Sequence, residues 1–287
     1  NPDLSHTKSS PQEGHETFKD FILELLPMAN EGITSPNHQQ SSSALIQKVQ
    51  KRLDFLLPFR SLAPTFVMAK STILSNQERL NTRAGLFNLV AFRGVFYGSY
   101  FAKTDLRYFA DLAAWKCHYC DAVPPDNMTK EAYYINKNCY GTAQAKRSVD
   151  VMNSYWEMAS GWQSHLNGNI SRDPLRLFEF FKTFKNIGDL SALLMVGDLA
   201  DVGFIPNFEP KQMGKFVFQA NKGARDGLHH LGLISSKADE AQVVQGFVDL
   251  HTFLEVELES EAKESIGYSV WMLEHALCKY KRLLKPR

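Results

Sequence analysis

Residues 236–259 read SKADEAQVVQGFVDLHTFLEVELE, and this stretch decides the fold class. Its second half carries the clearest strand signal in the chain, because apolar residues alternate with glutamates from 253 to 259. The same residues also fit a helix, whose apolar face would be Phe247, Leu250, Leu254 and Leu258. Ser236 and Asp239 resemble a capping box at the start of that helix. The helical interpretation therefore prevails, and we predict an all-α protein.

Helix start and stop signals support this prediction elsewhere in the chain. Ser43 is a plausible N-cap for apolar residues at helical spacing over 45–57, and Pro58 ends the run. Asp173 followed by Pro174 is a strong start signal, since proline is favoured at the first helical position. Residues 80–102 read as one long buried helix, with glycines that could kink it. We expect a multi-helix globular body over residues 44–287.

The N-terminal residues 1–43 are expected to form a flexible arm. Within it, apolar residues at helical spacing predict a short amphipathic helix over 16–26, which Pro27 ends. Residues 30–43, NEGITSPNHQQSSS, have the composition of a linker. A helix this short is unstable alone, so its apolar face must dock. It could dock on its own body, or it could be exchanged with a neighbouring subunit.

The amino-acid composition is that of an ordinary globular protein. It has 287 residues, 44% of them hydrophobic and 22% charged, with a formal net charge of +1. Four cysteines are too few for a disulfide-built scaffold, so we expect a cytoplasmic or virion protein that is not secreted. The longest apolar run, 86–102, contains Arg93, whose charge would cost about 3 kcal/mol within a membrane. No membrane partner is expected, and Arg93 should need a buried carboxylate or a phosphate.

Motif searches predict no catalytic residues and no cofactor. The chain has no phosphate-binding P-loop, no G-x-G-x-x-G turn and no G-x-S-x-G nucleophile elbow. Cys117, His118 and Cys120, with Cys139 further on, could supply zinc ligands, but the usual second ligand pair is missing. The favoured interpretation is that Cys117 and Cys120 are buried structural residues of a helix. We therefore expect no metal and no enzymatic activity.

Charge is unevenly distributed along the chain. Residues 44–110 hold ten basic and three acidic groups, interleaved with aromatic residues, whereas residues 239–264 hold eight acidic groups and one basic group. Basic residues with nearby aromatic rings suit contact with phosphates and unpaired bases. The simpler alternative is that the aromatic residues form the core and the charges are solvated. The predicted phosphate contacts are Lys48, Lys51, Arg52, Arg79 and Arg83.

Together these features favour a self-assembling structural protein that coats or encloses nucleic acid, most naturally RNA, as a viral coat (capsid) or nucleocapsid subunit does. Its partners would be other copies of itself, held through the N-terminal arm, and the phosphate backbone. One alternative is a helical enzyme or small-ligand protein without a visible motif, whose pocket could use Trp156, Trp162 and Tyr268. Another alternative is a cellular helical adaptor.

Overall fold

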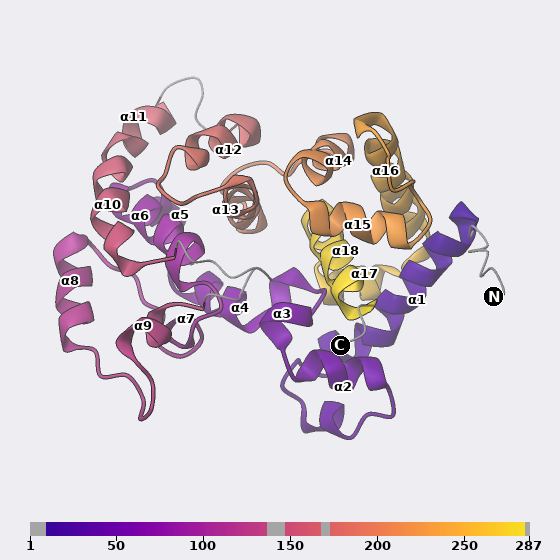
Figure 1. The fold of residues 1–287 in the computed structure, drawn as a ribbon, viewed down its shortest axis with the longest axis horizontal. Coiled ribbons are helices and arrows are strands. Elements are labelled where there is room, and N and C mark those ends of the chain that lie inside the picture. Colours follow the sequence, from indigo (N-terminus) through magenta and orange to yellow (C-terminus); the bar gives the residue numbers. More distant parts are fainter. Residues whose placement is uncertain (1–9, 137–146, 168–172, 285–287) are drawn as a thin grey trace, which may run out of the picture. The chain divides into compact units, whose positions relative to one another are not determined.

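The computed structural model describes residues 10–136, 147–167 and 173–284, and these residues form helices and connecting loops without a β-strand (Figure 1). The predicted all-α class is confirmed for this part of the chain. The backbone divides into two compact units, the first formed by residues 1–62 and 208–287 and the second by 63–207. None of the described helices is both long enough and apolar enough to span a membrane.

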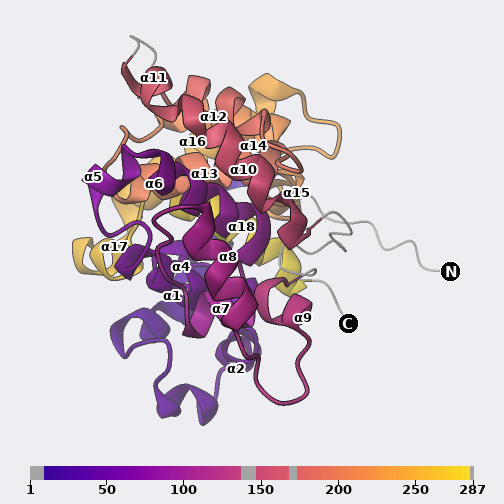
Figure 2. The ribbon, with the colours of Figure 1, turned by 90° about the vertical axis from the view of Figure 1, so that its left-hand side faces the viewer.

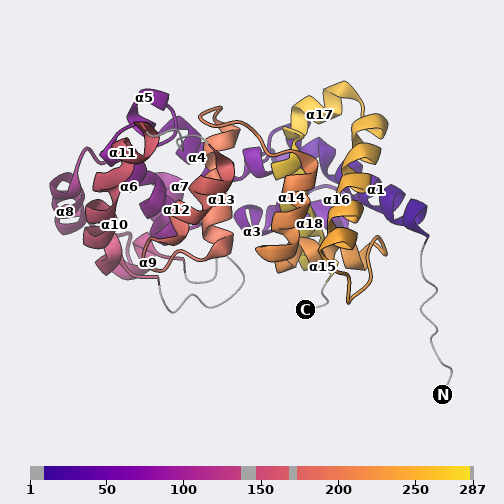
Figure 3. The same ribbon diagram turned by 90° about the horizontal axis from the view of Figure 1, so that it is seen from above.

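The first unit combines the two ends of the chain. Helix α14 packs along α16, and α15 packs along α18, as Figure 3 shows from above. Its core consists of residues that are fully or almost fully buried, among them Phe18, Leu25, Val49, Phe247, Leu250, Leu254 and Leu273. Its elements are α1 (Pro11–Asn30), η1 (Pro36–Gln39), α2 (Ala44–Gln50), α3 (Leu53–Leu56), η2 (Arg60–Leu62), α14 (Pro210–Gln219), α15 (Lys222–His230), α16 (Glu240–Glu257), α17 (Ser260–Ile266) and α18 (Val270–Leu284).

The second unit is built from shorter helices. Helix α12 packs on α13, and α7 lies beside α9 (Figure 2). Its elements are α4 (Pro64–Ser71), α5 (Gln77–Leu80), α6 (Arg83–Ala91), the π-helical turn η3 (Phe92–Phe96), α7 (Tyr100–Thr104), α8 (Leu112–Asp121), α9 (Lys130–Tyr134), η4 (Val149–Val151), α10 (Met152–Met158), η5 (Ala159–Gly161), α11 (Trp162–Asn167), α12 (Pro174–Lys182) and α13 (Asp189–Asp201).

Helix α16 contains the stretch that decided the fold class. It is one continuous helix, so the alternating residues near its end are helical. The prediction of its cap was wrong in detail. Asp239, not Ser236, is the N-cap, and its carboxylate accepts a hydrogen bond from the Gln242 amide at 2.9 Å. The Gln242 side chain accepts one from the Asp239 amide in return, which completes a capping box.

Two other predicted helix starts are confirmed. The Ser43 hydroxyl accepts a hydrogen bond from the Ile46 amide at 3.2 Å and caps α2. The Asp173 carboxylate accepts one from the Leu175 amide at 2.8 Å and caps α12. The helix predicted over 45–57 is divided, however, because the chain leaves helical geometry at Arg52 between α2 and α3.

The N-terminal helix is longer than the predicted 16–26. It begins at Pro11, where Ser10 and Glu13 form a capping box, and it continues past Pro27 to Asn30. Pro27 has no N–H to donate to the Leu23 carbonyl, so one helical hydrogen bond is lost there, but the Pro27 carbonyl still accepts a hydrogen bond from the Glu31 amide. Helix α1 packs within its own unit, with Phe18 edge-on to Tyr280 at 5.7 Å between ring centroids. Of the two docking alternatives, the structure adopts the one on the helix's own body.

The segment after α1 has a structure of its own. Part of it forms the short helix η1, and His38, only 2% exposed, contacts the Gly32 carbonyl at 2.8 Å. The Ser43 hydroxyl donates to the Glu24 carboxylate at 2.6 Å and so joins the start of α2 to α1. The expected boundary between an arm and a body at residue 44 therefore falls inside the first unit.

The predicted long helix over 80–102 is interrupted. It runs as α6, widens into η3 and ends at Phe96, two residues before Gly98, whose φ of 75° is a conformation that glycine adopts readily. The interruption leaves backbone carbonyls without helical partners. Arg147 donates to three of them, those of Arg93, Val95 and Tyr97, at 3.2–3.3 Å. These bonds explain how a buried helix can break here without exposing unpaired polar groups.

Arg93 has the buried carboxylate partner that its position in an apolar run predicts. Its guanidinium, 2% exposed, forms an ion pair with Asp198 of α13, which is 0% exposed. Arg93 Nε donates to Asp198 Oδ2 at 2.5 Å, and Nη2 donates to the other oxygen. The guanidinium also lies 4.3 Å from the Tyr97 ring centroid. The pair therefore joins η3 to α13 inside the second unit.

Candidate nucleic-acid interface

The five residues predicted to contact phosphate lie in both units. Lys48, Lys51 and Arg52 lie on or just after α2 in the first unit, whereas Arg79 in α5 and Arg83 at the start of α6 belong to the second. The structure brings the first three together because they are close in sequence. The other two form a separate group, again through their proximity in the chain.

Two of these cations are engaged by backbone carbonyls near helix ends. Lys48 Nζ donates to the Leu283 carbonyl in the last turn of α18 at 2.6 Å. Arg83 Nε and Nη2 donate to the Trp156 carbonyl in the last turn of α10 at 3.0 and 2.8 Å. The last carbonyls of a helix have no helical donor and attract cations. Lys48 and Arg83 thus have structural roles that the sequence did not indicate.

Phe55 of α3 is the centre of a basic cluster in the first unit. The guanidinium of Arg52 lies 4.1 Å from its ring centroid, and that of Arg282 lies 4.5 Å away. Lys279 Nζ is 6.0 Å from the same centroid and donates to the Asp54 and Phe55 carbonyls at 3.2 and 3.0 Å. We call Arg52, Phe55, Lys279 and Arg282 the Phe55 cluster. Its aromatic ring holds the cations in place through cation–π contact.

The two α18 members of the Phe55 cluster were not among the predicted site residues. The C-terminal run of basic residues, Lys279, Lys281 and Arg282, is visible in the sequence. Its proximity to Phe55 is not, because the hydrogen bond from Arg282 to the Phe55 carbonyl spans 227 positions of the chain. Local spacing carries no signal for such a contact.

Arg52 and Lys51 are the accessible cations at this site. Both are exposed, and neither side chain has a hydrogen bond or ion pair among the described residues. Lys51 also lines an open pocket of about 330 Å³ together with Gln39, Gln47 and Gln50. Each of these four residues carries a polar group, but most of the surface that lines the pocket is apolar.

Arg79 is the accessible cation of the second unit. It is exposed, and its guanidinium lies 4.9 Å from the ring centroid of Tyr108. Its side chain makes no hydrogen bond or ion pair within the described ranges. An arginine held over an aromatic ring, with its donors open to solvent, can contact a phosphate without first breaking another bond.

The two cysteines of α8 differ from the prediction in their exposure. Cys117 and Cys120 lie on α8 as expected, but both are exposed, so the expectation of buried core residues was wrong. The Cys117 thiol donates to the Asp121 carboxylate at 3.4 Å, and this contact raises the pKa of the thiol. Cys139 lies outside the described residues. Within them, no group of three or more potential ligands could hold a metal ion.

The aromatic residues proposed for a hidden pocket have structural contacts. Trp162 is 1% exposed, and its indole N–H donates to the Leu80 carbonyl at 2.7 Å. Trp156 stands edge-on to Phe87. Tyr268 belongs to the other unit, where its hydroxyl donates to the His251 carbonyl at 3.1 Å.

Buried polar atoms without partners also occur in the second unit. Tyr134, 0% exposed, lies among aromatic rings that include Phe101, Trp115 and His118. Neither the Tyr134 hydroxyl nor His118 Nε2 has a hydrogen-bond partner in the described part of the chain. Burial raises the pKa of Tyr134 and lowers that of His118, so both groups are held in their neutral forms near pH 7.

Comparison with known proteins adds no relative to this picture. No protein-family model, no curated protein and no solved structure matches the chain.

Proposed function

We propose that the protein is a non-enzymatic structural protein that binds nucleic acid, most naturally RNA, through its phosphate backbone and assembles around it as a capsid or nucleocapsid subunit does. Lys51, Arg52 and Arg79 make the phosphate contacts, and Lys48 and Arg83 add positive charge beside them. The observation that carries the proposal is the Phe55 cluster, where cations from distant parts of the chain gather around the Phe55 ring and one of them, Arg52, is exposed.

Binding of this kind depends on salt rather than on base sequence. Each neutralised phosphate of a single strand releases counterions and contributes about −0.7 to the slope of log affinity against log salt. Three contacts give a slope of roughly −2, and five give roughly −3.5. Fluorescence anisotropy with labelled RNA homopolymers, across a range of potassium chloride concentrations, measures this slope directly.

Two double variants, each lacking two positive charges, test whether the phosphate contacts are made at the proposed site. Lys51→Ala/Arg52→Ala should reduce the magnitude of the salt slope by about 1.4, because two contacts are lost. The control variant, Lys211→Ala/Lys215→Ala, removes two exposed lysines of α14 in the same unit and should leave the slope unchanged. An absence of binding at low salt, or an equal effect of both variants, would contradict the proposal.

Self-association is the second half of the proposal. Helix α1 is joined to α2 by a connection of 13 residues, so it could make its present contacts on a neighbouring copy instead. Native mass measurement at rising protein concentration, with and without RNA, tests this half separately. Large regular particles support a coat, whereas a monomer at every concentration would leave only an RNA-binding protein.

A further inference from the structure

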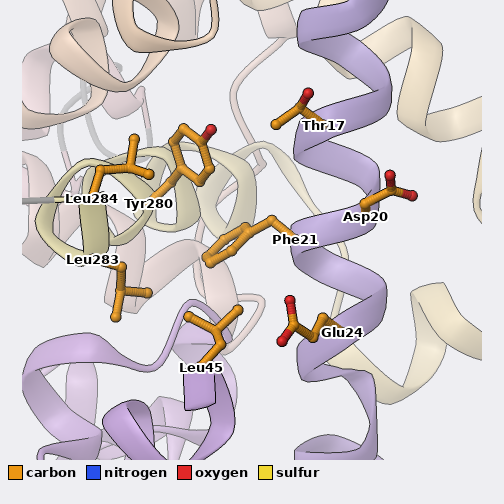
Figure 4. Close-up of a pocket in the computed structure, with 8 residues that line it drawn as sticks. All are labelled: Thr17, Asp20, Phe21, Glu24, Leu45, Tyr280, Leu283 and Leu284. Carbon is orange, nitrogen blue, oxygen red and sulfur yellow. The ribbon is translucent and has the colours of Figure 1, made fainter. Parts of the chain in front are cut away.

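A groove on the first unit lies between α1, α2 and α18. It is open to solvent and has a volume of about 430 Å³. Figure 4 shows Phe21 extending from α1 towards the side chains of α18, with Leu45 of α2 below. Eight residues line the groove: Thr17, Asp20, Phe21, Glu24, Leu45, Tyr280, Leu283 and Leu284.

The floor of the groove is apolar. Phe21 and Tyr280 pack edge-on at 5.1 Å between ring centroids, and each is less than a tenth exposed. Leu284, at the rim, is 47% exposed. Leu45 is half-buried, so the apolar surface that an occupant could cover comes mainly from Leu45 and Leu284.

The α1 side of the groove is acidic. Asp20 and Glu24 are four residues apart and therefore lie on the same face of the helix. Glu24 accepts a hydrogen bond from the Ser43 hydroxyl, whereas the exposed carboxylate of Asp20 has no partner among the described residues. The lining contains no lysine or arginine. An occupant that balances this surface must bring both apolar side chains and positive charge.

We propose that this groove binds a short amphipathic helix of a partner protein, which carries lysine or arginine beside its apolar face. The lining residues of α1, from Thr17 to Glu24, span about two helical turns, or roughly 10 Å. A docked helix of similar length would place apolar side chains at i and i+3 or i+4 against Phe21, Leu45 and Leu284. Its basic residues would face Asp20 and Glu24.

The test uses the full chain and two labelled helical peptides of equal length, each about three to four turns long. Both carry leucine on one face, and they differ only in having lysine or glutamate on the other. Fluorescence anisotropy should show binding of the lysine peptide and at least tenfold weaker binding of the glutamate peptide. Asp20→Asn/Glu24→Gln should weaken the lysine peptide about three- to tenfold, since rim charges affect affinity modestly. Leu284→Ser should weaken it as well.

The matched control is Glu261→Gln/Glu264→Gln, which removes two exposed acids of α17 outside the groove. It should leave the affinity for the lysine peptide unchanged. Equal binding of both peptides, equal losses in both acid variants, or no binding at all would overturn the proposal. The proposal would also be overturned if the protein self-associates in the absence of peptide and the Asp20→Asn/Glu24→Gln variant is monomeric, because the occupant of the groove would then be a second copy.

Discussion

Replacing Asp198 by asparagine removes one charge from the buried ion pair of the second unit. Asparagine is close in shape to aspartate but neutral, so the guanidinium of Arg93, 2% exposed, would lose the negative charge of Asp198 while it remains buried. Breaking a buried ion pair in this way costs about 3–5 kcal/mol. We expect the free energy of unfolding of the second unit to fall by about that amount, because the buried guanidinium would lose its ion pair with Asp198.

Urea unfolding followed by tryptophan fluorescence measures this change. Three of the four tryptophans, at 115, 156 and 162, lie in the second unit. With a denaturant slope near 2 kcal/mol per molar urea, the midpoint should fall by about 2 M. The double variant Arg93→Met/Asp198→Leu removes both charges and should be more stable than Asp198→Asn alone. A midpoint shift below about 0.5 M, or a double variant less stable than the single one, would refute the reasoning.

Two further predictions concern buried titratable groups. Tyr134→Phe should raise the free energy of unfolding by about 1 kcal/mol in the same assay, because it removes a buried hydroxyl without a partner; a loss of stability would contradict this. Burial lowers the pKa of His275 well below its ordinary value, so below about pH 6.5 only the unfolded chain takes up the proton. Stability should therefore fall with decreasing pH, by at most about 1.4 kcal/mol per unit for this group. His275→Gln should lessen that fall in urea midpoints measured from pH 7.5 to 5, and an unchanged slope would contradict the assignment.

The sequence predicted the fold class and several helix starts because these depend on local chemistry. Ser43 and Asp173 cap the helices that follow them, as their side-chain oxygens predict. The start of α1 was also predictable from the sequence, since Ser10 and Glu13 have capping-box spacing. The prediction placed the start at residue 16 because it used only the helical pattern of apolar residues. The glycines of 80–102 predicted a kink, but not a full break, because the carbonyls that the break leaves are satisfied by Arg147, about fifty positions away.

The candidate site was predictable only in part. Lys51 and Arg52 were identified from the local excess of basic residues. Their neighbour Arg282 comes from the other end of the chain, and only tertiary packing brings it to Phe55. The partner of Arg93 shows the same limit: its position in an apolar run predicts that a counter-charge is needed, but not that Asp198 supplies it.

The excess of basic residues over 44–110 has a structural cause as well as a functional interpretation. Each helix leaves about four carbonyls at its C-terminal end without helical donors, whatever its length, so a fold of short helices has many to satisfy. Two side chains of this segment supply part of that need: Lys48 donates to the Leu283 carbonyl, and Arg83 donates to the Trp156 carbonyl. In the sequence, basic residues that donate to helix-end carbonyls look the same as basic residues that are free to bind a phosphate. The charge available for phosphate is therefore smaller than the sequence suggests, and a salt slope nearer −2 than −3.5 is the value that this structure predicts.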